Sequence, residues 1–261
     1  MPLIDTHCHL SYPDFDADRE ASVTRAAEAG VTRFVNVATG PDCWEKYLAL
    51  ARADARVRVT LGFHPNDTAE SYTSARFEEL KALVTQERAL VVAIGETGLD
   101  FFRDNSGPEI QAQAFRAQLG LADETGLPFI LHCRKAERAM LDELTAHRER
   151  TGRALNGVWH CFTATPAFMR EAVELGLYLG FGGVLTYPKA EEVRQAAREA
   201  PADRLLLETD APFLAPQTKR GKRNEPAFVA ETAKMLAEVR GLTFEALSEL
   251  TTQNAHRLFK L

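Results

Sequence analysis

Along the chain, short runs of apolar and β-branched residues alternate with longer stretches in which apolar residues recur at helical spacing. Each short run is followed by a polar turn and then by a longer stretch, and this pattern repeats through the sequence. The short runs predict strands over Leu3–Thr6, Arg33–Val37, Val57–Leu61, Leu90–Gly95, Phe129–His132, Leu155–His160, Leu177–Phe181 and Arg204–Glu208. The longer stretches predict helices; Ala112, Phe115, Leu119 and Ala122, for example, form one apolar stripe.

A regular alternation of strands and helices is typical of a parallel sheet. Eight such units in 261 residues fit a closed (β/α)8 barrel, the TIM barrel, better than an open doubly wound sheet, and no GxGxxG motif follows the first predicted strand. No linker, low-complexity tract or change in composition divides the chain. We therefore expect an α/β protein that forms a single TIM-barrel domain over residues 1–261.

Composition mainly excludes other classes of protein. Hydrophobic residues at 45% and charged residues at 26% argue against disorder, a collagen-like chain and a long coiled coil. The net charge of −6 excludes a generally basic surface for nucleic acid, although a local basic patch remains compatible with it. The four cysteines form no CxxC pair, no signal-peptide pattern opens the chain, and no apolar run approaches the roughly 20 residues that span a bilayer. We expect a cytoplasmic protein without a membrane partner.

Polar residues gather where the predicted strands end. Five of the seven histidines lie at or just beyond such an end, and so do two carboxylates: His7, His9, His64, His132, His160, Glu96 and Asp210. In a TIM barrel these ends meet at one rim, and so many polar groups in one place need a cation. A lone histidine such as His64 is as often an ordinary hydrogen-bonded residue, and we expect structural roles for His147 and His256 in helical stretches.

The segment Asp5-Thr6-His7-Cys8-His9 is the sharpest local signal. Side chains alternate across a strand, so His7 and His9 face the same way and can bind one metal ion, with Asp5 on the same face as a hydrogen-bonding support. Cys8 then points outward. By the same alternation Cys133 and Cys161 are expected to pack under the helices, with thiolate ligation as the competing interpretation.

Taken together, several motifs resemble the TatD family of metal-dependent DNases. The resemblance runs from Leu3 to beyond Pro226 and rests on Asp5-Thr6-His7-Cys8-His9-Leu10, Gly62-Phe63-His64-Pro65, Ile94-Gly95-Glu96-Thr97-Gly98-Leu99-Asp100, Leu131-His132-Cys133-Arg134, His160-Cys161-Phe162-Thr163 and Glu208-Thr209-Asp210-Ala211-Pro212-Phe213-Leu214-Ala215-Pro216, with the basic Arg220-Gly221-Lys222-Arg223-Asn224-Glu225-Pro226 segment. One HxH motif is weak evidence, whereas six motifs in order are specific.

This family belongs to the amidohydrolase-like TIM barrels, and the resemblance implies hydrolysis at one or two divalent metal ions. It places His7, His9, Glu96 and Asp210 around one metal and Glu96, His132 and His160 around the other, with Glu96 as the bridge. Imidazole and carboxylate ligands suit Zn, Mn and, less selectively, Mg. As catalytic residues we expect Glu96 and Asp210; Asp210 either orients the attacking water and takes its proton or serves as a ligand alone.

An acidic protein that binds phosphates needs local positive charge. Lys219, Arg220, Lys222 and Arg223 supply four cations within five residues, and Arg134 and His64 are expected to add contacts deeper in the mouth. The alternatives are a solvated loop, or a loop that Arg223 holds over the site by pairing with Glu225 or Asp210. No aromatic-rich strip indicates a long single-strand groove, and Trp44 and Trp159 read as packing residues, so a chain end is the expected ligand.

The sequence therefore favours a metal-dependent hydrolase of the TatD type, a DNase or exonuclease that cleaves phosphodiester bonds. Its expected partner is a DNA end, with RNA or tRNA as further candidates, and its expected state is a monomer. One alternative keeps the metals and changes the bond: a metal-dependent ester hydrolase such as a D-aminoacyl-tRNA deacylase. The other alternative is a non-catalytic metal-binding scaffold, which the complete set of candidate ligands disfavours.

Overall fold

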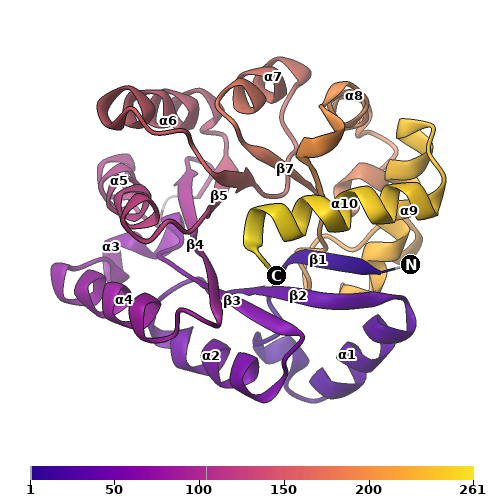
Figure 1. Ribbon diagram of the computed structural model, residues 1–261, viewed down its shortest axis with the longest axis horizontal. Coiled ribbons are helices and arrows are strands. Elements are labelled where there is room, and N and C mark those ends of the chain that lie inside the picture. Colours follow the sequence, from indigo (N-terminus) through magenta and orange to yellow (C-terminus); the bar gives the residue numbers. More distant parts are fainter. Residues whose placement is uncertain (1, 104) are drawn as a thin grey trace.

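A parallel sheet of eight strands forms the centre of the protein in the computed structural model, which describes residues 2–103 and 105–261 (Figure 1). The strands are β1 (Leu3–Cys8), β2 (Val31–Val37), β3 (Val57–Leu61), β4 (Val91–Asp100), β5 (Phe129–Arg134), β6 (Gly157–Trp159), β7 (Tyr178–Phe181) and β8 (Leu205–Leu207). Each strand pairs in parallel with the next along the chain. The predicted TIM-barrel fold is confirmed, and the predicted strands match these positions with shifts at their ends.

The sheet closes where β8 meets β1. Cys8 and Ala211 form a parallel bridge, the N–H of Asp210 donates to the carbonyl of His7 at 2.8 Å, and the N–H of His9 donates to the carbonyl of Ala211 at 2.8 Å. The Thr6 hydroxyl adds a bond to the carbonyl of Leu207 at 2.9 Å. Residues from the two ends of the sequence are therefore neighbours at one rim of the barrel.

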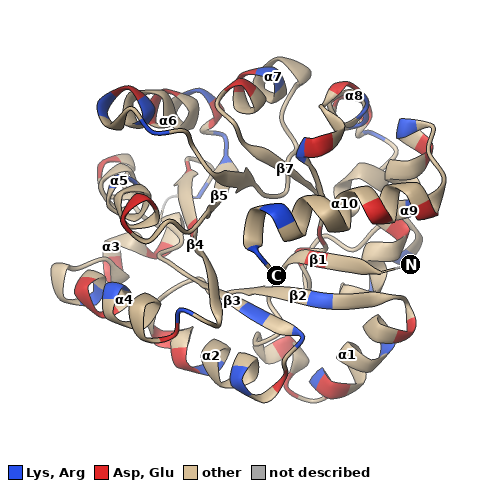
Figure 2. Cartoon of the chain, in the orientation of Figure 1, with Lys and Arg blue, Asp and Glu red and all other residues tan. Residues whose placement is uncertain are grey.

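Helices form the outer layer. They are α1 (Arg19–Glu28), α2 (Trp44–Ala53), α3 (Thr68–Ser71), α4 (Ser74–Gln86), α5 (Pro108–Thr125), α6 (Glu137–Thr151), α7 (Pro166–Glu174), α8 (Glu191–Glu199), α9 (Val229–Arg240) and α10 (Phe244–Phe259), with short 3-10 turns η1 (Pro13–Phe15), η2 (Pro41–Cys43), η3 (Pro65–Asp67), η4 (Gly183–Thr186), η5 (Ala202–Arg204), η6 (Gln217–Lys219) and η7 (Pro226–Phe228). Lys, Arg, Asp and Glu are concentrated on these helices (Figure 2). In the part of the chain that the structure describes, no helix has the length and apolarity that crossing a membrane requires.

Two apolar layers hold the barrel together. The larger lies between strands and helices and includes Trp44 and Trp159, each 1% exposed, so both are packing residues as predicted. The smaller fills the barrel interior with strand residues such as Val35 and Ile130 and is completed by Leu258 and Phe259 of α10. Helix α10 crosses the barrel end in Figure 1 and contacts β1 and β8. Because α10 covers the amino end of the strands, the carboxyl end is the one left open for a site.

Strand β4 runs five residues beyond its predicted end at Gly95. Gly98 pairs with His132 and Asp100 with Arg134, so the segment after Gly95 continues as an extended strand beside β5. Gly95 and Gly98 have φ of +142° and +133°, a conformation that only glycine adopts easily. Glu96 therefore lies inside β4, at the shift in register between Ile94 and Thr97, and not at the end of the strand.

Gly98→Ala is expected to lower the free energy of unfolding by about 3 kcal/mol or more, because a Cβ at this position would lie 2.1 Å from the backbone oxygen of His132 and the φ is unfavourable for alanine. Urea unfolding followed by circular dichroism measures the change. Gly120→Ala is the matched control: a Cβ there meets nothing within 4 Å, and alanine in the middle of α5 is expected to raise stability by up to about 1 kcal/mol. Equal stability of the two variants would contradict the close approach of β4 and β5.

Candidate metal centre

An open cavity of about 530 Å³ occupies the carboxyl end of the barrel. Its volume falls in the range of roughly 300–1,000 Å³ that is usual for small-molecule sites. The lining residues are His9, Tyr12, Thr39, His64, Asn66, Asp67, Glu96, Asp100, Arg103, His132, Cys133, Arg134, His160, Cys161, Thr163, Val184, Asp210, Phe213 and Leu214. Titratable residues from several strands meet on its floor, as the sequence predicts for this rim.

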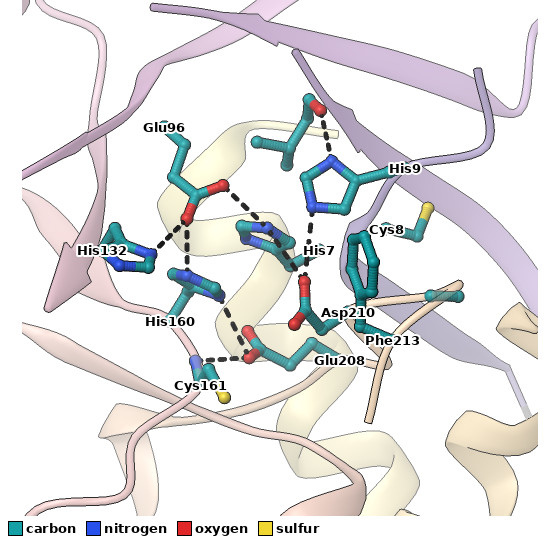
Figure 3. Close-up of polar contacts among 12 residues, drawn as sticks. His7, Cys8, His9, Glu96, His132, His160, Cys161, Glu208, Asp210 and Phe213 are labelled. Atoms are coloured by element: carbon teal, nitrogen blue, oxygen red, sulfur yellow. Dashed lines mark hydrogen bonds and ion pairs between the residues drawn. The ribbon is translucent and has the colours of Figure 1, made fainter. Parts of the chain in front are cut away.

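On one side of the floor, the junction of β1 and β8 brings His7, His9 and Asp210 together (Figure 3). The His9 Nδ1–H donates to the carbonyl of Val37 at 2.7 Å, which leaves Nε2 facing the Oδ1 of Asp210 at 3.3 Å. The Nε2 of His7 lies 3.7 Å from the same oxygen. The predicted alternation of His7 and His9 to one side of β1 is therefore what the structure has, with Cys8 buried among the outer apolar residues.

On the other side, Glu96 is the central group. Its Oε1 lies 2.9 Å from the Nδ1 of His132 and 2.9 Å from the Nε2 of His160, and its Oε2 lies 3.5 Å from the Nε2 of His7. The rings of His7 and His160 are stacked with centroids 3.8 Å apart. Glu96 thus connects the two sides of the floor, as a carboxylate that bridges two metal positions would (Figure 3).

His64 approaches the same carboxylate from the wall. Its Nδ1 accepts the backbone N–H of Asn66 at 3.2 Å, so in the neutral ring Nε2 carries the proton and points toward the Oε1 of Glu96 at 3.6 Å. Burial lowers the pKa of His64 to about 3, which keeps the ring neutral. An Nε2–H that faces the cavity is a hydrogen-bond donor to a bound molecule.

Two further carboxylates fix the histidines, and sequence analysis assigned a role to neither. The Oδ2 of Asp100 lies 2.9 Å from the Nε2 of His132, while its Oδ1 accepts the N–H groups of Phe102 and Arg103. The Oε1 of Glu208 accepts the N–H of Cys161 and lies 3.6 Å from the Nδ1 of His160. Both residues stand inside the quoted motifs, so the signal was present, but only the fold shows which histidine each one meets.

Asp5 meets the predicted ligand His7 through its backbone and makes its other hydrogen bonds to Thr209. Its carboxylate accepts the backbone N–H of Thr209 at 3.0 Å, bonds to the Thr209 hydroxyl at 2.6 Å and accepts the N–H of His7 at 3.3 Å. Burial raises the pKa of Asp5 to about 8, although these hydrogen bonds act to lower it. Asp5 thus ties the segment after β8, and hence Asp210, to β1.

The electrostatics of the floor follow from burial and close opposite charges. Burial raises the pKa of the Glu96 and Asp210 carboxyls, but the neighbouring histidines outweigh it: His160 and His64 hold the pKa of Glu96 well below its usual value, and His9 lowers that of Asp210. Burial and the nearby charge of His160 lower the pKa of His7. Both carboxylates are therefore ionised at neutral pH, and His7 is neutral.

The residues present fit a divalent cation. Three groups each bring their ligand atoms within 4.8 Å of one another: His7, His160 and Asp210; His7, His9 and Glu96; and His64, Glu96 and His132. Both ring nitrogens of His7 and the Nδ1 of His160 are buried without a hydrogen-bond partner among the described residues, and such atoms are costly unless something else binds them. The six predicted ligands thus lie together, and neutral imidazoles with carboxylates suit borderline divalent ions.

Two of the cysteines that were expected to pack under the helices also border the cavity. Cys133 packs partly against the outer apolar layer but also lines the cavity, and Cys161 lines the cavity beside His160. Cys161 has φ of +46°, because the chain turns sharply after β6 while its N–H reaches Glu208. Strand β6 has already ended at Trp159, so the alternation that the prediction assumed no longer applies at Cys161, whereas Cys133 lies inside β5.

The predicted phosphate contacts separate into two sets. Arg134 and His64 line the cavity. Arg220, Lys222 and Arg223 do not: the guanidinium of Arg223 donates to the carboxylate of Asp18 at 2.7 and 2.8 Å, and that of Arg220 stacks on the ring of Tyr187 at 4.5 Å. The expected partners of Arg223 were Glu225 or Asp210, and Asp18 is the residue it pairs with closely, Glu225 being 4.0 Å away. Arg223 therefore anchors its loop to α1.

The two histidines expected to be structural lie in helices, away from the cavity lining. In α6, the Nε2 of His147 lies 2.9 Å from the Oδ2 of Asp123, and its Nδ1 faces the guanidinium of Arg150 at 2.9 Å. In α10, the Nδ1 of His256 faces the carbonyl of Leu261 at 2.8 Å. Neither histidine is among the residues that line the cavity.

Comparison with known proteins places this geometry in context. A family model described as TatD related DNase matches residues 4–260. An uncharacterized metal-dependent hydrolase of Bacillus subtilis, YabD, is 39% identical over 259 residues and aligns over 99% of each chain. A protein of Cronobacter sakazakii named 3'-5' ssDNA/RNA exonuclease TatD is 39% identical over 98% of this chain and 97% of its own. The crystal structure of the TatD homologue YjjV of Escherichia coli superposes with a TM-score of 0.92 at 35% identity, over 99% and 98% of the two chains.

Proposed function

Because the chain belongs to the TatD related DNase family and is a metal-dependent hydrolase, we propose that it removes nucleotides from an end of single-stranded DNA or RNA. The observation that carries the proposal is the floor of the cavity. Four histidines and two carboxylates converge there, at the bottom of a cavity of about 530 Å³. Three of the histidine ring nitrogens have no hydrogen-bond partner among the described residues. Relatives at 38% and 39% identity that are named as 3'-5' single-strand exonucleases support the choice of substrate class.

We assign the ligands from the contacts of the floor. His7, His9, Glu96 and Asp210 would hold one cation, and Glu96, His132 and His160 a second one, with Glu96 shared because it faces both groups. When bound, Zn, Mn or Mg ions supply Lewis acidity, which activates water near neutral pH and stabilises negative charge on a phosphoryl oxygen.

The side chains of this chain divide the remaining work. Asp210 is ionised and lies at the open edge of the floor, where its carboxylate can orient water and accept its proton; the alternative role is ligation alone. The Nε2–H of His64 is positioned to donate to a phosphate oxygen, and Arg134 on the cavity wall supplies positive charge for the strand. Asp100 and Glu208 keep the rings of His132 and His160 in place.

Removal of metal and its return is expected to switch the activity off and on. After dialysis against a chelator, a single-stranded oligonucleotide labelled at its 5′ end should stay intact, and saturation with Mn²⁺ or Zn²⁺ should restore release of mononucleotides by at least about a hundredfold over the chelated sample. Denaturing gel electrophoresis of 5′- and 3′-labelled strands measures the products and the polarity of digestion.

The control for contaminating nucleases is His132→Ala, purified and loaded with metal in the same way. Amino acid released from charged tRNA without cleavage of the strand would replace the proposed activity by that of a deacylase. Metal retention with neither activity would contradict hydrolysis of nucleic acid altogether.

A further inference from the structure

Exposed aromatic residues lie in two loops at the carboxyl end of the barrel, although the sequence shows no aromatic-rich strip. Among the residues that the structure describes, the large hydrophobic side chains that are exposed are Phe101, Phe102, Phe213, Leu214 and Leu242. Four of these five lie in two loops, the one after β4 and the one after β8. Exposed apolar groups gathered beside a polar site mark a surface that binds a ligand.

On the β8 side, Phe213 lines the cavity three residues after Asp210 and remains 45% exposed. Its ring meets Tyr12 edge to face, with centroids 5.5 Å apart, and lies 6.1 Å from the ring of His9. The backbone is held as well: the N–H of Phe213 donates to the carbonyl of Asp210 at 2.8 Å, and its carbonyl accepts the amide of Asn224 at 2.6 Å. The ring is therefore held beside the catalytic floor with much of its surface open (Figure 3).

On the β4 side, Phe102 is 59% exposed and the guanidinium of Arg134, a cavity-lining residue, stacks on its ring at 3.8 Å from the centroid. Asp100 fixes this loop by accepting the N–H of Phe102 at 2.9 Å. The same aspartate contacts His132, so one carboxylate positions both this loop and a histidine of the cavity floor. A stacked arginine and phenylalanine offer both a planar surface and a positive charge.

The two surfaces face each other across the site. Strands β4 and β8 are four places apart in an eight-stranded closed barrel, so their carboxyl ends lie on opposite sides of the mouth. A phosphodiester bond has one nucleoside on each side of it. A strand that crosses the mouth with its phosphate above Glu96 and Asp210 therefore brings one base toward Phe213 and the neighbouring base toward Phe102 and Arg134.

We propose that Phe213 on one side and the Phe102–Arg134 pair on the other stack against the two unpaired nucleobases that flank the scissile phosphate. This inference rests on the proposed nuclease function and specifies its substrate. Stacking requires bases that are not buried in a duplex, so the clamp selects single-stranded ends, and it reads no sequence because every base has a flat face.

Oligonucleotides with an abasic residue at the last or at the second-last position test the clamp. With wild-type protein each abasic residue is expected to raise KM about tenfold relative to the natural strand, the size of one lost stacking contact. Phe213→Leu should abolish discrimination against one of the two abasic positions and Phe102→Leu against the other. Phe213→Trp, which keeps a flat ring, should discriminate between natural and abasic strands as the wild type does. Leu242→Ala changes an exposed apolar residue after α9 and should leave this discrimination unchanged.

For each variant, fluorescence anisotropy measures binding of the same strands, and elemental analysis measures the metal content. If wild-type protein cleaves the natural strand and both leucine variants still discriminate as wild type does, the clamp is overturned while the nuclease function stands. If metal-loaded wild-type protein neither binds nor cleaves any of the strands, the proposed function fails and the clamp fails with it. A KM that rises equally for natural and abasic strands in the variants also overturns the clamp.

Discussion

Replacing Glu96 by glutamine is expected to lower kcat by at least about a thousandfold and to reduce the metal bound per chain. The Glu96 carboxylate faces His7, His132 and His160 together, at 3.5, 2.9 and 2.9 Å. Glutamine keeps the size of the side chain but loses the negative charge, so one neutral amide oxygen replaces two carboxylate oxygens that share a negative charge. Elemental analysis after refilling with metal and the rate of mononucleotide release measure the two effects.

The matched control is Glu199→Gln, which makes the same chemical change on the outer surface of α8 and should leave both quantities unchanged. Glu96→Asp adds a graded test, since it keeps the charge but shortens its reach; it is expected to retain more metal than the glutamine variant. A glutamine variant with wild-type metal content and turnover would refute the proposal that Glu96 is a ligand shared by two cations.

Much of the fold can be predicted from the sequence because the barrel repeats one local pattern of strand and helix. The β-branched runs and the helical stripes are short-range signals, and the alternation of His7 and His9 on β1 follows directly from strand geometry. The grouping of strand ends at one rim then follows from the topology. For these reasons the seven polar residues at the strand ends could be grouped at one rim without coordinates, and the resemblance to the TatD family singled out six of them as ligands.

What the sequence could not supply is contact between distant segments. Asp5 was expected to support a histidine, and it does accept the backbone N–H of His7, but its other partner is Thr209, which is 204 positions away. Arg223 was expected over the site, but it pairs with Asp18, 205 positions away. Local pattern places a residue on a face of its own element, whereas its partner depends on which loop folds against that face.

The loops after β4 and β8 show the same limit. The predicted strand ended at Gly95, whereas β4 continues to Asp100 through two glycines with positive φ. Phe102 and Phe213 are separated by over a hundred positions, and no linear strip of aromatic residues connects them. Closure of the barrel brings their loops to opposite sides of one mouth, beside the same cluster of histidines and carboxylates.

Asp210→Asn distinguishes the two roles that remain open for this residue. Asparagine keeps an oxygen ligand but is not a base, so if Asp210 accepts the proton of the attacking water, the variant is expected to keep most of the bound metal while kcat falls by about a hundredfold to ten-thousandfold. The surroundings permit this role. Burial alone would raise the pKa of Asp210, but the hydrogen bond with His9 and the nearby His7 and His160 lower it below its usual value, so the carboxylate is ionised throughout the neutral range.

The sign of the pH dependence follows from that lowered pKa. A base that must be unprotonated loses function as pH falls through its pKa, so wild-type kcat should carry no decline from Asp210 near neutrality, and any acid limb that belongs to this group lies below its ordinary value of 3.8. In the asparagine variant the residual rate should lack that limb. Asp203→Asn, an exposed change just before β8, controls for the substitution itself. Loss of metal in parallel with turnover would assign Asp210 to ligation alone, and unchanged turnover with full metal would remove it from the chemistry.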